Sequence, residues 1–226
     1  MRQIILDTET TGLNPATGDR IIEIGCIELI NRRQTGKTLH HYINPERDIA
    51  EGAFAVHGLS REFLSDKPLF AHIVEELTEF VKDAEVIIHN APFDVGFINM
   101  ELGLIERPPI EGVVENIIDT LKMAKDMRPG QRNSLDALCR FYNIDNSQRS
   151  LHGALLDAQL LAEVYLAMTR GQEDLMIDFQ YSGTDIAGEK NTHRPANLFV
   201  LKASDEELKS HEAYLNKMKG EKKLIW

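Results

Sequence analysis

The sequence predicts an α/β protein: a mixed five-stranded sheet flanked by helices, followed by a flexible linker and a C-terminal helix. Segments with strand character come first, and short apolar runs then alternate with helical patterns. The 226 residues are 42% hydrophobic and 27% charged, which is ordinary for a globular protein. Residues 180–197 are rich in Ser, Gly, Thr, Asn and Pro, a composition typical of a linker.

Three strands are expected to open the chain as an antiparallel meander. The β-branched run that ends at Leu6 predicts a buried strand. Residues 20–31 (RIIEIGCIELIN) place apolar side chains on both faces, which indicates a long second strand that is mostly buried. Residues 35–37 are interpreted as a turn. A third strand is expected over residues 38–44, because Pro45 then ends it.

Helices and strands are expected to alternate in the middle of the chain. Residues 46–68 are interpreted as irregular, whereas the apolar stripe over residues 69–82 predicts a helix. The remaining expected elements are strands at 85–89 and 116–119, and helices at 92–104, 120–127, 134–142 and 153–168. Ser204 to Glu207 form a capping box, which predicts the start of a terminal helix.

The net charge of −11 limits how this protein can meet a polyanion. Nucleic-acid-binding proteins usually carry a basic footprint, and this chain does not. Two alternatives follow. Either the substrate is DNA and bound metals with a partner protein bring the two together, or the substrate is not a polyanion.

The two cysteines and the hydropathy pattern indicate the cellular compartment of the protein. Cys26 and Cys139 lie far apart in apolar surroundings, so reduced core residues are expected rather than a disulfide. No apolar run approaches the roughly 20 residues that span a bilayer, and no signal peptide is recognised at the N-terminus. A cytoplasmic location without membrane contact is therefore expected.

Two acids stand at the end of the first strand. Asp7 and Glu9 are separated by one residue, so both carboxylates project from the same face of the strand. Two carboxylates about 4 Å apart repel by roughly 4 kcal/mol at an effective dielectric of about 20. Hard oxygen ligands of this kind suit Mg²⁺ or Mn²⁺. A strand running into a polar turn is the alternative when these residues are considered alone.

Two further acids lie on apolar helix faces. Asp94 and Asp157 each have mostly apolar neighbours three and four residues away. A charge that faces the core without a partner costs several kcal/mol or shifts its pKa. The four acids together indicate one shared cation site. Caps or surface positions would explain each acid alone, but explain all four together poorly.

Histidine 152 precedes the helix that carries Asp157. An imidazole there suits a general base near neutral pH, although a solvated histidine is the alternative. His57 lies in a loop and could contact substrate or stabilise a turn. The sequence has no Gly-rich phosphate loop and no Cys/His zinc spacing, which excludes nucleotide-fold and zinc-finger sites.

Three motifs resemble those of the DnaQ-like family of 3′→5′ exonucleases, which has four acids and a histidine. They are Asp7-Thr8-Glu9-Thr10-Thr11-Gly12, His89-Asn90-Ala91-Pro92-Phe93-Asp94 and His152-Gly153-Ala154-Leu155-Leu156-Asp157-Ala158. Residues 56–58 and 132–138 are also similar, and the resemblance covers nearly the whole chain. Within that family the chain closely resembles the proofreading subunits of bacterial replicative DNA polymerases.

A ribonuclease-H-like fold and removal of mispaired 3′-terminal nucleotides are what this resemblance implies. It assigns Asp7 as a bridge between two divalent metal ions, Mg²⁺ or Mn²⁺. Glu9 and Asp157 would hold the ion that binds the attacking water, Asp94 would support the other ion, and His152 would be the general base. The implied substrate-binding residues are Asp7, Glu9, Thr10, Glu51, His57, Asn90 and Phe93. Close relatives carry a glutamate where this chain has Gly52, so the contact expected of the neighbouring Glu51 stays open.

The resemblance also divides the chain into an exonuclease domain (1–171), a linker (172–203) and a tail helix (204–226). The tail would bind the polymerase catalytic subunit in the bacterial replisome, although an ordinary terminal helix is an alternative. Gln172, Leu175 and Ile177 resemble a sliding-clamp motif, or else simply begin the linker. A small accessory subunit on the exonuclease domain is left open. A polymerase tether would supply effective concentration in place of intrinsic DNA affinity.

Two other functions are considered beside proofreading. A free-standing exonuclease of the same superfamily that trims RNA would not need a linker and a docking helix. A catalytically silent scaffold between polymerase and clamp would be expected to lack one of the acids or the histidine, and none is missing.

Overall fold

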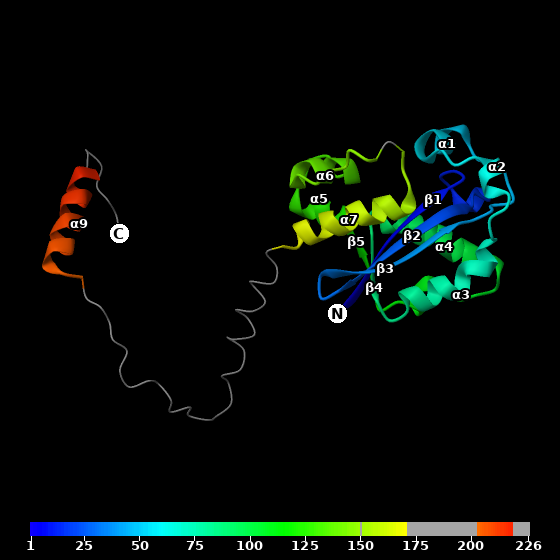
Figure 1. Ribbon diagram of the computed structural model, residues 1–226, viewed down its shortest axis with the longest axis horizontal. Coiled ribbons are helices and arrows are strands. Elements are labelled where there is room, and N and C mark those ends of the chain that lie inside the picture. The colour runs from blue at the N-terminus through cyan, green and yellow to red at the C-terminus, as the bar shows by residue number, and fades with distance from the viewer. Residues whose placement is uncertain (150, 171–202, 219–226) are drawn as a thin grey trace, which may run out of the picture. The chain divides into compact units, whose positions relative to one another are not determined.

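The computed structural model describes residues 1–149, 151–170 and 203–218 (Figure 1). The chain divides into two units, Met1–Met176 and Ile177–Trp226. The strands of the first unit are β1 (Arg2–Thr10), β2 (Ile21–Ile30), β3 (Arg33–Tyr42), β4 (Glu85–Ile88) and β5 (Asn116–Asp119). Its α-helices are α1 (Glu51–His57), α2 (Arg61–Leu64), α3 (Phe70–Val81), α4 (Ala91–Leu104), α5 (Thr120–Met127), α6 (Leu135–Tyr142) and α7 (Ala154–Met168). Two 3₁₀ turns, η1 (Pro15–Thr17) and η2 (Ile110–Gly112), complete it.

The sheet is mixed and has the strand order β3-β2-β1-β4-β5. β1, β2 and β3 pair antiparallel, while β4 pairs parallel with both β1 and β5. The predicted meander and the five-stranded mixed sheet are therefore confirmed. β1 lies in the centre, so side chains at its C-terminal end are reached by segments on both of its sides.

The turn expected at residues 35–37 is wrong. The β2–β3 hairpin turns at Asn31 and Arg32, both with positive φ, which is the backbone that tight two-residue hairpins require. The predicted turn instead lies inside β3, where the register slips between the Ile27–Thr38 and Leu29–Gln34 pairs. The glycine that suggested a turn, at φ 85°, therefore belongs to a bulge.

Residues 46–68 were expected to be irregular, but they form the short helices α1 and α2. The Ser60 hydroxyl caps α2 by accepting from the Phe63 amide at 3.1 Å. The apolar residues here do not mark a buried stripe, since Phe54 and Val56 are 47% and 42% exposed. Without that stripe, the periodicity that identified the other helices is missing.

Helices cover both faces of the sheet (Figure 1). Ile4 and Leu6 pack with α3 and α4 on one face, whereas Ile5 faces α6 and α7 on the other. Because side chains alternate along a strand, Asp7 continues the Ile5 face, the side of α7. Gly25 pairs with Asp7, and a Cβ added at Gly25 would lie 2.3–2.5 Å from backbone atoms of residues 154–155. A glycine here lets the start of α7 approach the acidic end of β1.

The third strand begins at Arg33, five residues before its expected start, whereas the elements expected between residues 69 and 168 are confirmed with ends shifted by at most two residues. Both cysteines are buried and free, as expected. The second unit contains α9 (Asp205–Met218), which begins with the expected capping box, because Ser204 Oγ accepts from the Glu207 amide and Glu207 accepts from the Ser204 amide. Among the described helices, none is long and apolar enough to cross a bilayer. The proposed clamp residues Gln172, Leu175 and Ile177 lie outside the described residues.

Candidate active site

The four predicted acids meet at the C-terminal end of β1. Asp7 and Glu9 come from β1, while Asp94 and Asp157 lie in the first turns of α4 and α7. All four line one cavity of about 260 Å³, which His152 also lines. Two helix N-termini thus present their acids to one strand end, an arrangement that helix dipoles favour.

Hydrogen bonds fix Asp94 against the central strand. Its Oδ1 accepts from the Thr8 amide at 3.1 Å and from the Thr8 hydroxyl at 2.7 Å. Thr8 alternates with Asp7 and Glu9 along β1, so the strand end binds Asp94 with one residue and projects two carboxylates with its neighbours. Asp94 is 3% exposed. Its orientation is therefore set by the fold.

Burial and mutual repulsion oppose ionisation of three of these acids. Burial, and then the charges of Asp94, Asp157 and Glu9, raise the pKa of Asp7 well above its ordinary value. Burial, followed by the Asp157 charge, raises the pKa of Glu9 to about 8. Burial likewise raises the pKa of Asp94 to about 7, despite its bonds from Thr8. Such shifts in a cleft mark a functional site.

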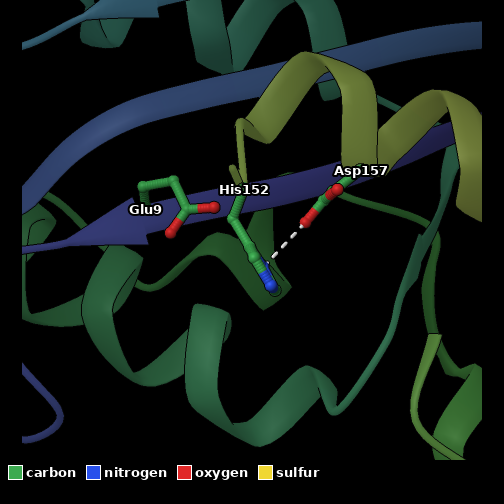
Figure 2. Close-up of side chains that lie close together, drawn as sticks. All are labelled: Glu9, His152 and Asp157. Carbon is green, nitrogen blue, oxygen red and sulfur yellow. Dashed lines mark ion pairs between the residues drawn. The ribbon is translucent and has the colours of Figure 1, made fainter. Parts of the chain in front are cut away.

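The donor set fits divalent cations that prefer oxygen. Figure 2 shows Glu9 facing His152 and Asp157, and ligand atoms of these three residues lie within 4.8 Å of one another. Carboxylate oxygens suit Mg²⁺ or Mn²⁺, so the acids, and not the imidazole, are the ligands that this set offers such ions. Positive charge would also relieve the repulsion that raises the pKa values of Asp7 and Glu9.

The backbone on both sides of His152 holds the histidine at this cavity. Its amide donates to the Val56 carbonyl of α1 at 3.0 Å, and α7 begins two residues later. Its Nδ1 lies 3.2 Å from Asp157 Oδ2 (Figure 2). The side chain is 42% exposed, so the imidazole combines a buried partner with access to solvent.

Arg149 is a site residue that the sequence reasoning missed. Its Nε and Nη2 donate to the two oxygens of Asp157 at 2.5 Å each, and its Nη1 donates to Asp136 at 2.8 Å. The Arg149 side chain is 6% exposed. Burial acts to raise the pKa of Asp157, but the adjacent His152 side chain and the two hydrogen bonds from Arg149 hold that pKa below its ordinary value. An arginine three residues before His152 carries no periodicity or spacing that marks it for an acidic site; only unpaired acid charge in the cavity could have suggested it.

A second cavity of about 580 Å³ adjoins the acids and shares Glu9 and Phe93 with the first. Among the predicted substrate-binding residues, Thr10 and His57 also line it. His57 is buried and its Nδ1 accepts from the Leu59 amide at 3.0 Å. Its proton is then on Nε2.

The structure does not bring the other two predicted contacts to either cavity. Glu51 is exposed on α1, where its neighbours Ala50 and Gly52 line the second cavity in its place. Asn90 is exposed at the N-cap of α4, and its backbone N–H donates to Asp119 Oδ1. Its left-handed backbone, φ 71°, turns the chain from β4 into the helix that presents Asp94.

Comparisons with known proteins show the family of this chain. A family model described as "Exonuclease" matches residues 4–165. DNA polymerase III subunit epsilon of Salmonella typhimurium is 50% identical over 224 residues, with 95% of this chain and 92% of that protein covered. The same subunit of Rickettsia felis is 49% identical, with 96% of both covered.

Solved structures are similar at lower identity. Exonuclease X in complex with 5′ overhanging duplex DNA is 24% identical with a TM-score of 0.59, and the match covers 76% of this chain and 93% of that chain. The nuclease domain of 3′hExo bound to rAMP is 18% identical with a TM-score of 0.64, with coverage of 75% and 92%. These likenesses concern the fold, and they confirm the ribonuclease-H-like architecture.

Proposed function

Because this chain belongs to the exonuclease family, in the branch of the DNA polymerase III epsilon subunits, we propose that the cavity at the end of β1 is a proofreading 3′→5′ exonuclease site. The activity is hydrolysis of the phosphodiester at a DNA 3′ end, with release of mononucleotides. The observation that carries the assignment of the site is the convergence of Asp7, Glu9, Asp94 and Asp157 with His152 in one cavity.

The four acids would hold divalent metal ions, Mg²⁺ or Mn²⁺. Asp7 would share its carboxylate between two ions, Glu9 and Asp157 would bind one of them, and Asp94, which Thr8 orients, would support the other. When bound, such ions activate water and stabilise the attacking and leaving oxygens of an in-line displacement.

His152 is the proposed general base. It takes the proton of the water that attacks phosphorus while the bond to the leaving 3′ oxygen breaks. The exposed edge of the imidazole gives access to that water. The hydrogen bond from the His152 backbone amide to the Val56 carbonyl keeps the imidazole beside the acids.

The neighbouring cavity is the proposed site for the terminal nucleotide. Phe93 offers an aromatic face on which a base can stack, and His57 offers an Nε2–H donor. Thr10 and the adjoining backbone line the same space. For Glu51 and Asn90 a role in substrate binding is proposed only through movement on binding, because both lie outside the cavity described here.

The tail and linker are proposed to connect the enzyme to its replisome partners. Residues 204–226 would bind the polymerase catalytic subunit, and Gln172, Leu175 and Ile177 would contact the sliding clamp. The support is the capped helix α9 and the similarity to epsilon subunits over nearly the full chain. A tether compensates for the weak DNA affinity expected at a net charge of −11.

The test is degradation of a single-stranded DNA oligonucleotide labelled at its 5′ end, with Mg²⁺ or Mn²⁺. Wild-type protein should shorten it stepwise from the 3′ end, whereas Asp7→Ala should not. Asp126→Ala, which removes an exposed acid of α5, is the matched control and should behave as wild type. No shortening by folded, metal-loaded protein would refute the assignment and favour a scaffold. Preference for an RNA oligonucleotide would instead favour a free-standing RNA exonuclease.

A further inference from the structure

Arg149 holds the proposed base and a proposed metal ligand at the same time. One guanidinium bonds both oxygens of Asp157 through Nε and Nη2, and the same Nη2 lies 2.7 Å from His152 Nδ1. The side chain is nearly buried, so these contacts are made away from bulk water. Its remaining nitrogen, Nη1, bonds Asp136 at the edge of the cavity.

These contacts determine which nitrogen of His152 carries the proton. Arginine has donors and no acceptor, so Nδ1 must accept from Nη2. A neutral imidazole whose Nδ1 accepts carries its proton on Nε2. Neither nitrogen then has a free lone pair. While Arg149 bonds Nδ1, His152 therefore cannot take a proton from water.

Loss of this contact would favour the opposite tautomer. Nδ1 lies 3.2 Å from Asp157 Oδ2, which can accept an Nδ1–H once Nη2 no longer donates to Nδ1. Solvent would take the proton from Nε2 and another would reach Nδ1, so the charge of the ring does not change. Nε2 would then have a free lone pair, as a general base requires.

Asp136 gives Arg149 a second partner. Its carboxylate is 39% exposed and accepts from Arg149 and from Asn146. If Asp157 is to bind a cation, its oxygens must be released by the guanidinium. Arg149 can leave Asp157 while its bond to Asp136 persists.

We propose that Arg149 is a positioning residue that couples metal binding at Asp157 to the tautomer of His152. Bound to Asp157, Arg149 keeps the proton of His152 on Nε2 and the base inactive. When Asp157 binds a cation, Arg149 withdraws toward Asp136 and His152 Nε2 becomes free. The enzyme thereby gains its base only with its metal. This inference rests on the proposed metal site and base.

The first test reads the tautomer directly. Full-length protein labelled with ¹⁵N-histidine is studied by long-range ¹H–¹⁵N spectra at about pH 8.5, where ordinary histidines are neutral. The His152 signals are assigned by their loss in His152→Gln. Metal-free wild type should carry the proton on Nε2, and saturating Mg²⁺ should move it to Nδ1. A metal-free protein with the proton already on Nδ1, or no change with Mg²⁺, would overturn the proposal.

Two substitutions separate this role from a merely structural one. By calorimetric titration with Mg²⁺, Arg149→Gln should bind metal about ten-fold more tightly, because a competing hydrogen-bonded cation is removed. Asp136→Asn should bind about three-fold more weakly, because the withdrawn arginine loses its charged partner. Arg140→Gln, an exposed arginine of α6, is the matched control. Weaker binding in both site variants would mean that Arg149 only supports the fold, and would refute the coupling.

Failure of this inference can be told apart from failure of the proposed function. A metal-dependent change of tautomer in a protein that releases no nucleotides would refute the function and leave the coupling intact. Nucleotide release by a protein in which the His152 tautomer does not change with Mg²⁺ would refute the coupling and leave the proposed function intact.

Discussion

Replacing Glu9 by glutamine should stabilise the metal-free protein, although it removes a proposed metal ligand. Burial and the Asp157 charge raise the pKa of Glu9 from 4.5 to about 8. A folded state that holds a proton more tightly than the unfolded chain loses stability as pH rises from 4.5 toward 8. At pH 7 that loss is about 3 kcal/mol, at about 1.4 kcal/mol for each pH step above 4.5. Glutamine has no such loss.

The assay is thermal unfolding followed by circular dichroism with a chelator present. For a domain of this size, about 3 kcal/mol corresponds to roughly 6–12 °C in Tm. Glu9→Gln should exceed wild type by this amount at pH 7 and approach it near pH 4.5. The exposed Glu79→Gln on α3 is the control and should differ little at either pH. Saturating Mg²⁺ should raise the Tm of wild type more than that of Glu9→Gln.

Equal melting temperatures of Glu9→Gln and wild type at pH 7, or a difference that does not vary with pH, would refute the reasoning. In the first case the Glu9 carboxylate would not be strained by its surroundings. If the difference does not vary with pH, the effect of glutamine would come from packing, because packing contributes equally at all pH values. Either result would remove the electrostatic argument for a cation at this position.

Three further outcomes follow from the same geometry. His152→Gln should lose most nucleotide release at saturating Mg²⁺ without changing Mg²⁺ affinity by more than a few-fold; an unchanged rate would contradict the base assignment. Mg²⁺ affinity measured by calorimetry should rise from pH 6 to 8, because raised pKa values of about 8 for Glu9 and about 7 for Asp94 leave protons to displace at low pH; a flat profile would contradict it. Gly25→Ala should cost roughly 1–3 kcal/mol in chemical denaturation by forcing α7 from β2, whereas Gly96→Ala, with open space around it, should not destabilise.

The sheet and the long helices could be predicted because burial imposes a period on the sequence. β2 is buried on both faces and α3 buries one stripe, and the apolar residues of each follow that burial. The errors fall where a different constraint decides. The hairpin turns at Asn31 and Arg32 because their backbone accepts positive φ, while Gly36, the residue that looks most like a turn, is used for a bulge. α1 consists mostly of exposed residues and ends at Gly58, which has a left-handed backbone, so it has no apolar stripe.

The acids of the site could be predicted from the sequence pattern, but Arg149, which bonds Asp157, could not. Asp94 and Asp157 stand out because each is a charge among apolar neighbours on a helix. Arg149 is in a segment without regular structure, and its direction depends on where Asp136, His152 and Asp157 meet in space. The converse holds for Glu51, which lies beside the cavity-lining Gly52 in sequence yet remains outside the cavity.

At this site the stability of the metal-free protein and its affinity for metal both depend on the repulsion among the four acids. Buried carboxylates that repel one another destabilise the metal-free fold, and a cation bound at the proposed site would relieve that repulsion. The free energy that the repulsion costs the metal-free fold would then contribute to metal affinity. The same electrostatic argument predicts that metal binds before DNA. In a chain of net charge −11, a cluster of ionised acids repels a phosphodiester, and positive charge at those acids reverses the local sign. DNA would therefore meet a favourable site only after the cations are bound, and under the coupling proposed for Arg149 this is also when His152 Nε2 would be free to act as a base.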